Sequence, residues 1–97
     1  MTDQFVPAEP FPPGEFIQEE LDARGWKQED LSEILGISRR QVANLLTGAS
    51  AVTPGVARLL GKAFDQDPRT WTNLQVSYEL ALAAQKERDT ARQATQG

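Results

Sequence analysis

The sequence predicts an all-α fold of five helices. Apolar residues recur at spacings of three and four residues, whereas no segment alternates with a period of two over a useful length. Gly25, Gly36 and Gly48 each follow an apolar helical run, as left-handed glycines do at helix ends. Thr53-Pro54 and Asp67-Pro68 each pair a capping side chain with a proline that favours the first helical turn. We therefore expect helices throughout and no strands.

The composition excludes several classes of function. The 97 residues include no Cys and no His, so we expect no disulfide, no zinc site and no His-based acid–base catalysis. The sequence shows no nucleophile–base pair, no set of metal ligands and no phosphate-binding loop. We therefore expect that the protein is not an enzyme and binds no cofactor and no metal. No apolar run approaches about 18 residues, and the N-terminus lacks a secretion signal. We therefore expect one globular domain in the cytoplasm, without a membrane partner.

Charge is distributed unevenly along this acidic chain, whose net charge is −4. Residues 1–23 contain six acidic and no basic residues, whereas residues 24–62 contain six basic and three acidic residues. The basic middle segment favours a nucleic-acid surface, while the acidic remainder weakens non-specific attraction to phosphate. We expect modest DNA affinity for one monomer and a need for dimers.

Residues 1–12 are expected to form a flexible N-terminal arm, because they contain three prolines and no helical period. Phe5, Val6 and Phe11 are apolar residues in this arm. Two interpretations stay open for them: they rest loosely on the domain, or they dock on a partner.

Two short helices are expected to follow the arm. The first begins near Pro13-Gly14 and ends at Gly25, and the second runs from about Lys27 to Leu35. The residues expected to face the core are Phe16, Ile17 and Leu21 in the first helix and Leu31, Ile34 and Leu35 in the second.

A third helix is expected from Ser38 to Gly48, because Ser38-x-x-Gln41 is a capping box. It follows the second helix after the short turn Gly36-Ile37-Ser38. At about 100° per residue, Val42, Leu45 and Leu46 share the side that must face the core. The opposite side shows Arg40, Asn44 and Thr47 to water, with Ala43 and Arg39 on its flank.

The exposed residue types of the third helix suit the reading of DNA bases. Arg can make a bidentate contact with guanine and Asn with adenine, and a small Ala leaves room for a thymine methyl group. The start of the second helix suits a phosphate, because its backbone amides and dipole attract anions. The alternative is that these residues only solvate a helix face, and the cap would occupy Gln41. The candidate DNA-binding residues are Lys27, Gln28, Ser38, Arg39, Arg40, Gln41, Ala43, Asn44 and Thr47.

Two further helices are expected after the third. Thr53-Pro54 opens the fourth, and Asp67-Pro68 opens a fifth that runs from Arg69 past Lys86. The apolar residues of the fourth are Val56, Leu59, Leu60, Ala63 and Phe64. In the fifth, Trp71, Leu74, Tyr78 and Leu82 form a core-facing side, and Val76, Leu80, Ala83 and Ala84 form a second apolar side.

A helix that is apolar on two sides is expected to be buried on both. In so small a domain, the second side of the fifth helix needs a second copy of the chain or another protein, and we favour the dimer. The alternative is a broad core-facing helix with a few exposed aliphatic residues. We accordingly divide the chain into the arm 1–12, a DNA-binding domain 13–85 that includes the dimerisation helix, and a fraying tail 86–97.

Residues 28–46 resemble the helix-turn-helix of the phage-repressor-like (Xre) regulators. The runs Pro13-Gly14-Glu15-x-x-x-Glu19-Glu20-Leu21 and Trp71-x-Asn73-Leu74-Gln75-x-x-Tyr78-x-Leu80 extend the resemblance, over about residues 13–82, to the HigA family of antitoxins. The second run is the more specific, because general repressors lack it. The chain departs from the family at Pro12, where His is frequent, and at Ser32, where Ala is usual. A hydroxyl at Ser32 fits if it bonds back to a carbonyl one turn earlier.

The resemblance implies a five-helix phage-repressor-like helix-turn-helix domain with an extended C-terminal helix. It further implies a homodimer on a palindromic operator, autorepression of the operon, and neutralisation of a partner toxin that cleaves translated mRNA. Two alternatives remain. One is a stand-alone Xre-type regulator without a toxin, and the other is a protein-binding adaptor that has lost DNA binding.

Overall fold

The computed structural model describes residues 10–96, and within them it contains five helices and no strand. The helices are α1 (Pro13–Arg24), α2 (Gln28–Leu35), α3 (Arg39–Thr47), α4 (Pro54–Phe64) and α5 (Pro68–Gln96). The prediction of a five-helix, all-α fold is confirmed. Phe5 and Val6 of the expected arm lie outside the described residues.

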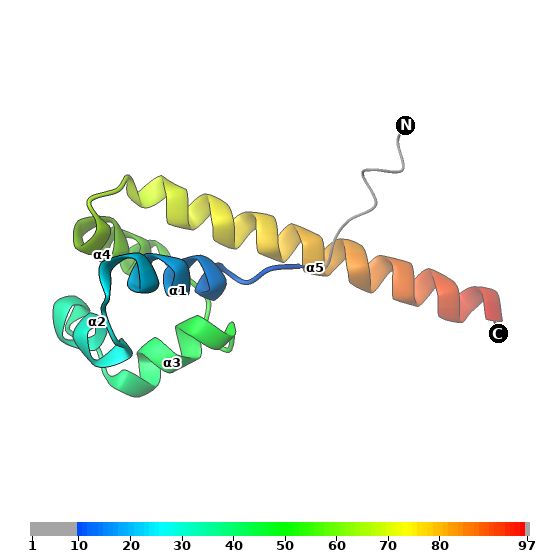
Figure 1. Ribbon diagram of the computed structural model, residues 1–97. Helices are drawn as coiled ribbons and strands as arrows, with labels where there is room; N and C mark the ends of the chain where they lie inside the picture. Colours follow the sequence, from blue (N-terminus) through cyan, green and yellow to red (C-terminus); the bar gives the residue numbers. More distant parts are fainter. Residues whose placement is uncertain (1–9, 97) are drawn as a thin grey trace.

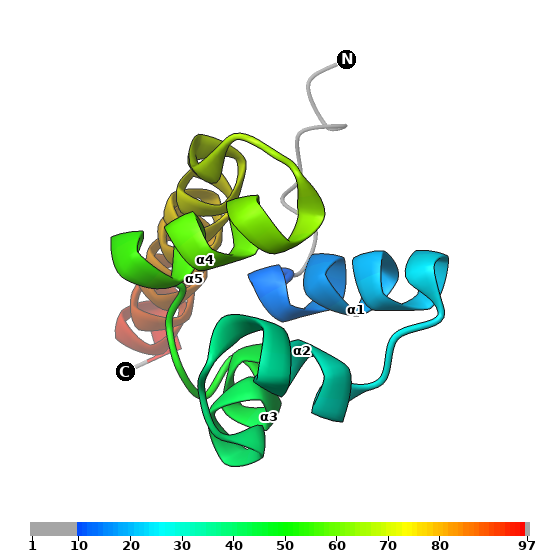
Figure 2. The ribbon, with the colours of Figure 1, turned by 90° about the vertical axis from the view of Figure 1, so that its left-hand side faces the viewer.

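The first four helices and the start of α5 form the body of the domain, and the rest of α5 extends away from it (Figure 1). Helix α1 packs against both α3 and α5, while α4 packs against α5 and α2. Helices α2 and α3 lie on the side of the body opposite the start of α5, as Figure 2 also shows. One side of α3 is therefore left without a covering helix.

Local signals set the helix boundaries as expected. Helix α1 begins at Pro13 and is followed by Gly25, and α2 is followed by Gly36 in the left-handed conformation, with φ of 73°. Helix α4 begins after Thr53, whose hydroxyl accepts a hydrogen bond of 3.3 Å from the amide of Val56. Helix α5 continues through residues 86–96, so the fraying expected there stays a prediction.

The core lies between the helices and draws residues from all five. Its largest fully buried side chain is Trp71, which joins α5 to the ring of Phe64 on α4 at a centroid distance of 5.8 Å. The other buried apolar residues are Ile17, Leu21, Leu31, Leu35, Val42, Leu45, Val52, Ala57 and Leu60. Burial of this set is the main stabilising contribution that a domain of this size has available.

Three residues expected in the core are exposed instead, and for these the prediction was wrong. Ile34 is 49% exposed because α2 is covered by α3 and α4 only on the side of Leu31 and Leu35. Leu82 is 40% exposed because α5 has left the body by that point (Figure 1). Phe16 is 36% exposed and borders a small groove, of about 230 Å³, with Phe11 of the arm.

Ser32 does not bond back along its own helix. Its hydroxyl donates a hydrogen bond of 2.6 Å to the carbonyl oxygen of Ile37, five residues later, in the turn before α3. The departure from the family residue therefore adds a contact that holds the α2–α3 turn. No helix in the described part of the chain is long and apolar enough to cross a membrane.

Gly14 allows the start of α1 to lie directly against the end of α3. A Cβ atom at this buried position would overlap the backbone carbonyl oxygens of Leu45 and Leu46. These atoms belong to the backbone of α3, so they cannot move aside without moving the helix. The close approach of the two backbones thus depends on the absence of a side chain.

We expect Gly14→Ala to lower the free energy of unfolding by about 1–3 kcal/mol or more, because the added methyl group must displace α3. The measurement is urea unfolding followed by circular dichroism. Gly55→Ala is the matched control, since the nearest atom to its added Cβ would be Thr53 Oγ1 at 3.9 Å. Gly55→Ala should leave stability unchanged or slightly raised, and equal stability of the two variants would contradict the packing argument.

Candidate nucleic-acid interface

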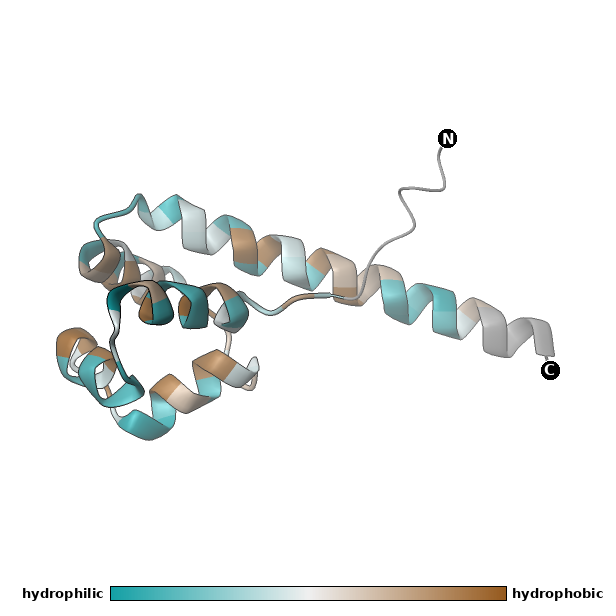
Figure 3. Cartoon of the chain, in the orientation of Figure 1, coloured by the Kyte–Doolittle hydropathy of each residue, from teal (hydrophilic) through white to brown (hydrophobic). Residues whose placement is uncertain are grey.

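Helices α2 and α3 form a helix-turn-helix, in which α1 packs against α3 and α4 packs against α2. Val42 is fully buried and Leu45 is 4% exposed, so the inner side of α3 is anchored in the core. Because a helix turns by about 100° per residue, this anchoring presents the opposite side of α3 to solvent. Figure 3 shows hydrophilic residues at the start of α3, on this uncovered side.

The expected capping box at the start of α3 is present. The amide of Gln41 donates to the hydroxyl of Ser38 at 3.0 Å, and the amide of Ser38 donates to Gln41 Oε1 at 2.9 Å. Two of the candidate DNA-binding side chains are thus engaged in holding the helix end. Their exchange of hydrogen bonds fixes where α3 begins, while the side-chain amide nitrogen of Gln41 keeps its donors.

Thr47 has a similar structural task at the other end of α3. Its hydroxyl donates to the carbonyl oxygen of Asn44 at 3.3 Å and accepts from the amide of Ala49 at 3.4 Å. At the start of α2, the amide of Lys27 donates to Asp30 Oδ2 at 2.8 Å. These contacts satisfy backbone groups that a helix end would otherwise leave unpaired.

Three candidates remain without an intramolecular role on the uncovered side of α3. Arg40 is exposed, and Ala43 and Asn44 are partly buried against the body. Within residues 10–96, the side chains of Arg40 and Asn44 take part in no hydrogen bond or ion pair, and neither does that of Gln28 on α2. These polar groups are therefore available to an external partner.

Arg39 is the one cation of α3 that the protein itself engages. Its Nη1 atom lies 2.8 Å from Glu29 Oε2 in the first turn of α2, and both side chains are largely exposed. From the sequence, Glu29 is only one of the three acidic residues in the basic middle segment, and its contact with Arg39 was not predicted. The signal available was its place directly after Gln28, because the first turns of α2 and α3 meet across the short turn.

Not every basic residue of the middle segment lies at the candidate interface. Arg24 donates to the backbone carbonyl of Phe64 at 3.1 Å and lies over the Phe64 ring, at the end of the body formed by α1 and α4. It also pairs with Glu20, and the hydrogen bond from Arg24 holds the pKa of the Glu20 carboxyl below its usual value despite partial burial. Arg24 therefore contributes to the fold and does not form part of the candidate interface.

A buried amide connects the loop after α3 to α5. The amide of Val52 donates to Gln75 Oε1 at 2.8 Å, and Gln75 Nε2 donates to Glu79 at 2.9 Å. Gln75 is 9% exposed, so its side chain has a structural role between the loop and α5. Asn73 of the same run is exposed.

The second apolar side of α5 is uncovered in the single chain. Val76 is 52% and Leu80 is 66% exposed, Ala83 is exposed, and Ala84 is partly buried. Figure 3 shows hydrophobic residues along the middle of α5. Large exposed apolar residues in one row are typical of an interaction surface.

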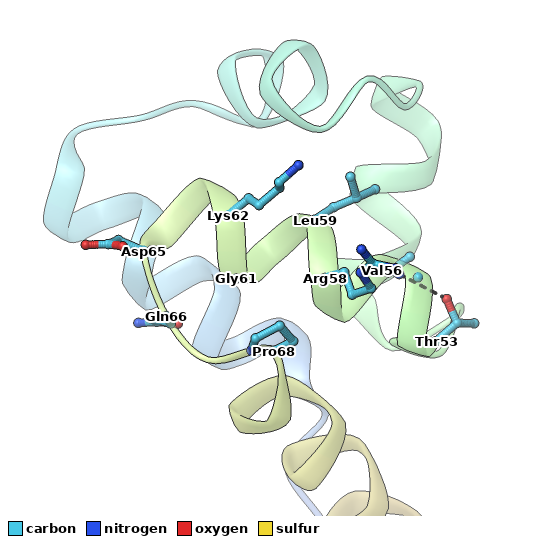
Figure 4. Close-up of a pocket in the computed structure, with 10 residues that line it drawn as sticks. Thr53, Val56, Arg58, Leu59, Gly61, Lys62, Asp65, Gln66 and Pro68 are labelled. Carbon is cyan, nitrogen blue, oxygen red and sulfur yellow. Dashed lines mark hydrogen bonds between the residues drawn. The ribbon is translucent and has the colours of Figure 1, made fainter.

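A surface hollow of about 790 Å³ lies along α4 and the α4–α5 turn (Figure 4). Its charged lining residues are Arg58, Lys62 and Asp65. None of the candidate DNA-binding residues borders it, and it shows no pairing of a nucleophile with a base. Among the described residues, no group of three or more acidic side chains is arranged to hold a metal ion.

Comparison with known proteins assigns the family. The sequence pattern of the helix-turn-helix family matches residues 17–71, which include α2 and α3 entire. The chain belongs to the helix-turn-helix family. This membership agrees with the Xre-type resemblance predicted from residues 28–46.

Two curated helix-turn-helix relatives are transcriptional regulators by name. The chain is 38% identical over 68 residues to an uncharacterised HTH-type transcriptional regulator of Haemophilus influenzae, a match that covers 69% of this chain and 64% of that protein. It is 35% identical over 71 residues to the uncharacterised regulator YddM of Escherichia coli, covering 73% and 76%. The chain thus spans slightly less than two thirds of the first relative.

Solved structures of antitoxins and antidote proteins share the fold over most of the chain. A Nostoc punctiforme protein assigned as an antidote of a plasmid maintenance system has a TM-score of 0.85 at 33% identity, covering 91% of this chain and 97% of that one. A HigA-family addiction-module antidote from Coxiella burnetii has a TM-score of 0.80 at 31% identity, covering 89% and 95%. Pseudomonas aeruginosa antitoxin HigA, solved with the higBA promoter, has a TM-score of 0.77 at 28% identity, covering 84% and 90%. The predicted resemblance to HigA-family antitoxins is confirmed.

Proposed function

We propose that this helix-turn-helix protein is an antitoxin-type transcriptional repressor that binds palindromic operator DNA as a homodimer and represses its own operon. The observation that carries the proposal is the uncovered side of α3, where Arg40 and Asn44 have no partner in residues 10–96. Both are residue types that contact base edges in the major groove. The similarity to an antitoxin solved with its promoter supports the same use of this surface.

The remaining candidates are assigned by their contacts. Ser38, Gln41 and Thr47 define the ends of α3, so they contribute to DNA binding chiefly by fixing the helix. Lys27 and Gln28 stand at the start of α2, where backbone amides and the helix dipole favour a phosphate. Ala43 leaves space beside Arg40 and Asn44 for a base or a methyl group.

We expect Arg40→Ala to weaken binding to the chain's own promoter at least about fivefold, because one bidentate base contact supplies roughly 1–3 kcal/mol of discrimination. Binding to a scrambled duplex should change much less. The measurement is fluorescence anisotropy with both duplexes at one salt concentration. Arg88→Ala on the exposed part of α5 removes the same charge away from α3 and should leave promoter affinity nearly unchanged. Equal loss on both duplexes would make Arg40 a phosphate contact.

The homodimer is proposed to form through the second apolar side of α5. Val76, Leu80 and Ala83 are exposed and lie at spacings of four and three residues, so they form one row along the helix. A two-fold dimer presents two α3 helices, and palindromic operators carry two half-sites about 34 Å apart. Pairing of the rows would also remove apolar surface from water.

We expect Leu80→Glu to convert the dimer to monomers, because it places a charge in the centre of the apolar row. Sedimentation velocity measures the mass in solution. Leu82→Glu is the matched control, since Leu82 is also an exposed leucine of this helix but is rotated by about 200° from Leu80. The control should remain dimeric, and an unchanged mass of Leu80→Glu would reject this interface.

The proposed second activity is neutralisation of a partner toxin that cleaves translated mRNA. Its support is the similarity over nearly the whole fold to addiction-module and plasmid-maintenance antidotes. A toxin gene of this kind is expected beside the gene of its antitoxin, so the product of the adjacent reading frame is the partner to test.

Expression of the adjacent reading frame alone should stop growth and shorten translated mRNAs, and co-expression of this chain should restore both. Growth curves and primer extension on an abundant mRNA measure the two effects. Because neutralisation is proposed to need no DNA contact, Arg40→Ala should neutralise as well as the wild type. Absence of growth arrest, or arrest that this chain does not relieve, would favour a stand-alone regulator.

A further inference from the structure

The contact between Glu29 and Arg39 sits at the edge of the proposed DNA-binding surface. Arg39 is the first residue of α3 and Glu29 is the second residue of α2, and their charged atoms are 2.8 Å apart. The side chain of Arg39 is 69% exposed and that of Glu29 is 58% exposed, so solvent reaches both partners. An ion pair this exposed is weak and can open when a competing anion approaches.

The two acidic residues at the start of α2 have different partners. Asp30 accepts a hydrogen bond from the amide of Lys27 and thereby completes the helix start. Glu29 has no such task, and its carboxylate is directed across the helix-turn-helix to the guanidinium of Arg39. It lies directly beside Gln28, the proposed phosphate contact, where a carboxylate repels the phosphates that the surface must approach.

We propose that Glu29 is a specificity-determining positioning residue, which withholds Arg39 from the phosphates of random DNA and so raises the preference for the operator. The inference rests on the proposed function. Non-specific affinity comes almost entirely from cations that neutralise phosphates. While Glu29 holds Arg39, this guanidinium does not neutralise a phosphate. A phosphate would first have to displace the Glu29 carboxylate and would then lie next to its negative charge.

Operator binding depends less on Arg39. Arg39 lies on the flank of the uncovered side of α3, whereas Arg40 and Asn44 lie on the side itself and supply the proposed base contacts. Arg39 can therefore stay paired with Glu29 while the operator is read. Loss of Glu29 would add one phosphate contact to random complexes without adding a base contact to the specific one.

The test measures the affinity of Glu29→Gln for the chain's own promoter and for a scrambled duplex of equal composition, over a range of salt concentrations. We expect affinity for the scrambled duplex to rise roughly 3- to 10-fold at low salt. The slope of log affinity against log salt should steepen by about 0.9, the contribution of one further phosphate. The ratio of promoter to scrambled affinity should fall accordingly.

Two comparisons separate this role from a general charge effect. Glu33→Gln removes the same charge from an exposed position of α2 that does not contact Arg39, and it should steepen the slope much less. In an Arg39→Gln background, Glu29→Gln should steepen the slope no more than Glu33→Gln does. Equal slopes for Glu29→Gln and Glu33→Gln, or a steeper slope that persists without Arg39, would overturn the inference.

The outcomes also separate this inference from the proposed function. If the wild type does not prefer its promoter to the scrambled duplex, the proposed repressor function fails, and a positioning role in specificity fails with it. If the wild type prefers its promoter and Glu29→Gln keeps both the salt slope and the preference, only the role of Glu29 fails. Thermal unfolding of each variant followed by circular dichroism confirms that the compared proteins are folded.

Discussion

The close contact between the start of α1 and the end of α3 is the constraint on which the presentation of α3 depends. At Gly14 the two backbones approach so closely that no side chain can stand between them. The approach lets Val42 and Leu45 enter a core that α1 also lines through Ile17 and Leu21. With its inner side fixed in this way, α3 has one orientation, and the direction of its outer side chains follows from helical geometry.

The caps at the two ends of α3 also define where the helix begins and ends along its axis. Ser38 and Gln41 determine where the helix starts, and Thr47 closes its last turn. Side chains that look like DNA contacts by type thus divide into a set that shapes the helix and a set that can meet a partner. The division matters because a base contact requires a side chain that is both correctly placed and not already engaged.

Helix α5 gives the fold a physical link between its two proposed binding surfaces. Gln75 holds the loop that follows α3 through the amide of Val52, and it lies one residue before Val76 in the exposed apolar row. A partner that covers this row would therefore stabilise the helix that positions the loop. The basic residues also divide between two roles: Arg24 contributes to the fold, whereas Arg40 remains exposed to solvent.

The sequence by itself determined the five helices, the boundaries of the first four and the residue types on the outer side of α3. These features depend on interactions within a few residues, such as the Ser38–Gln41 cap and the glycine after α2. Only the tertiary structure decided which side chains are covered or engaged. Ile34 is exposed because no other helix covers its side of α2. Arg39 is paired because Glu29, ten residues earlier in the chain, lies next to it in the folded structure. Periodicity cannot report such contacts, since it records the direction of a side chain on its own helix and nothing of what lies opposite.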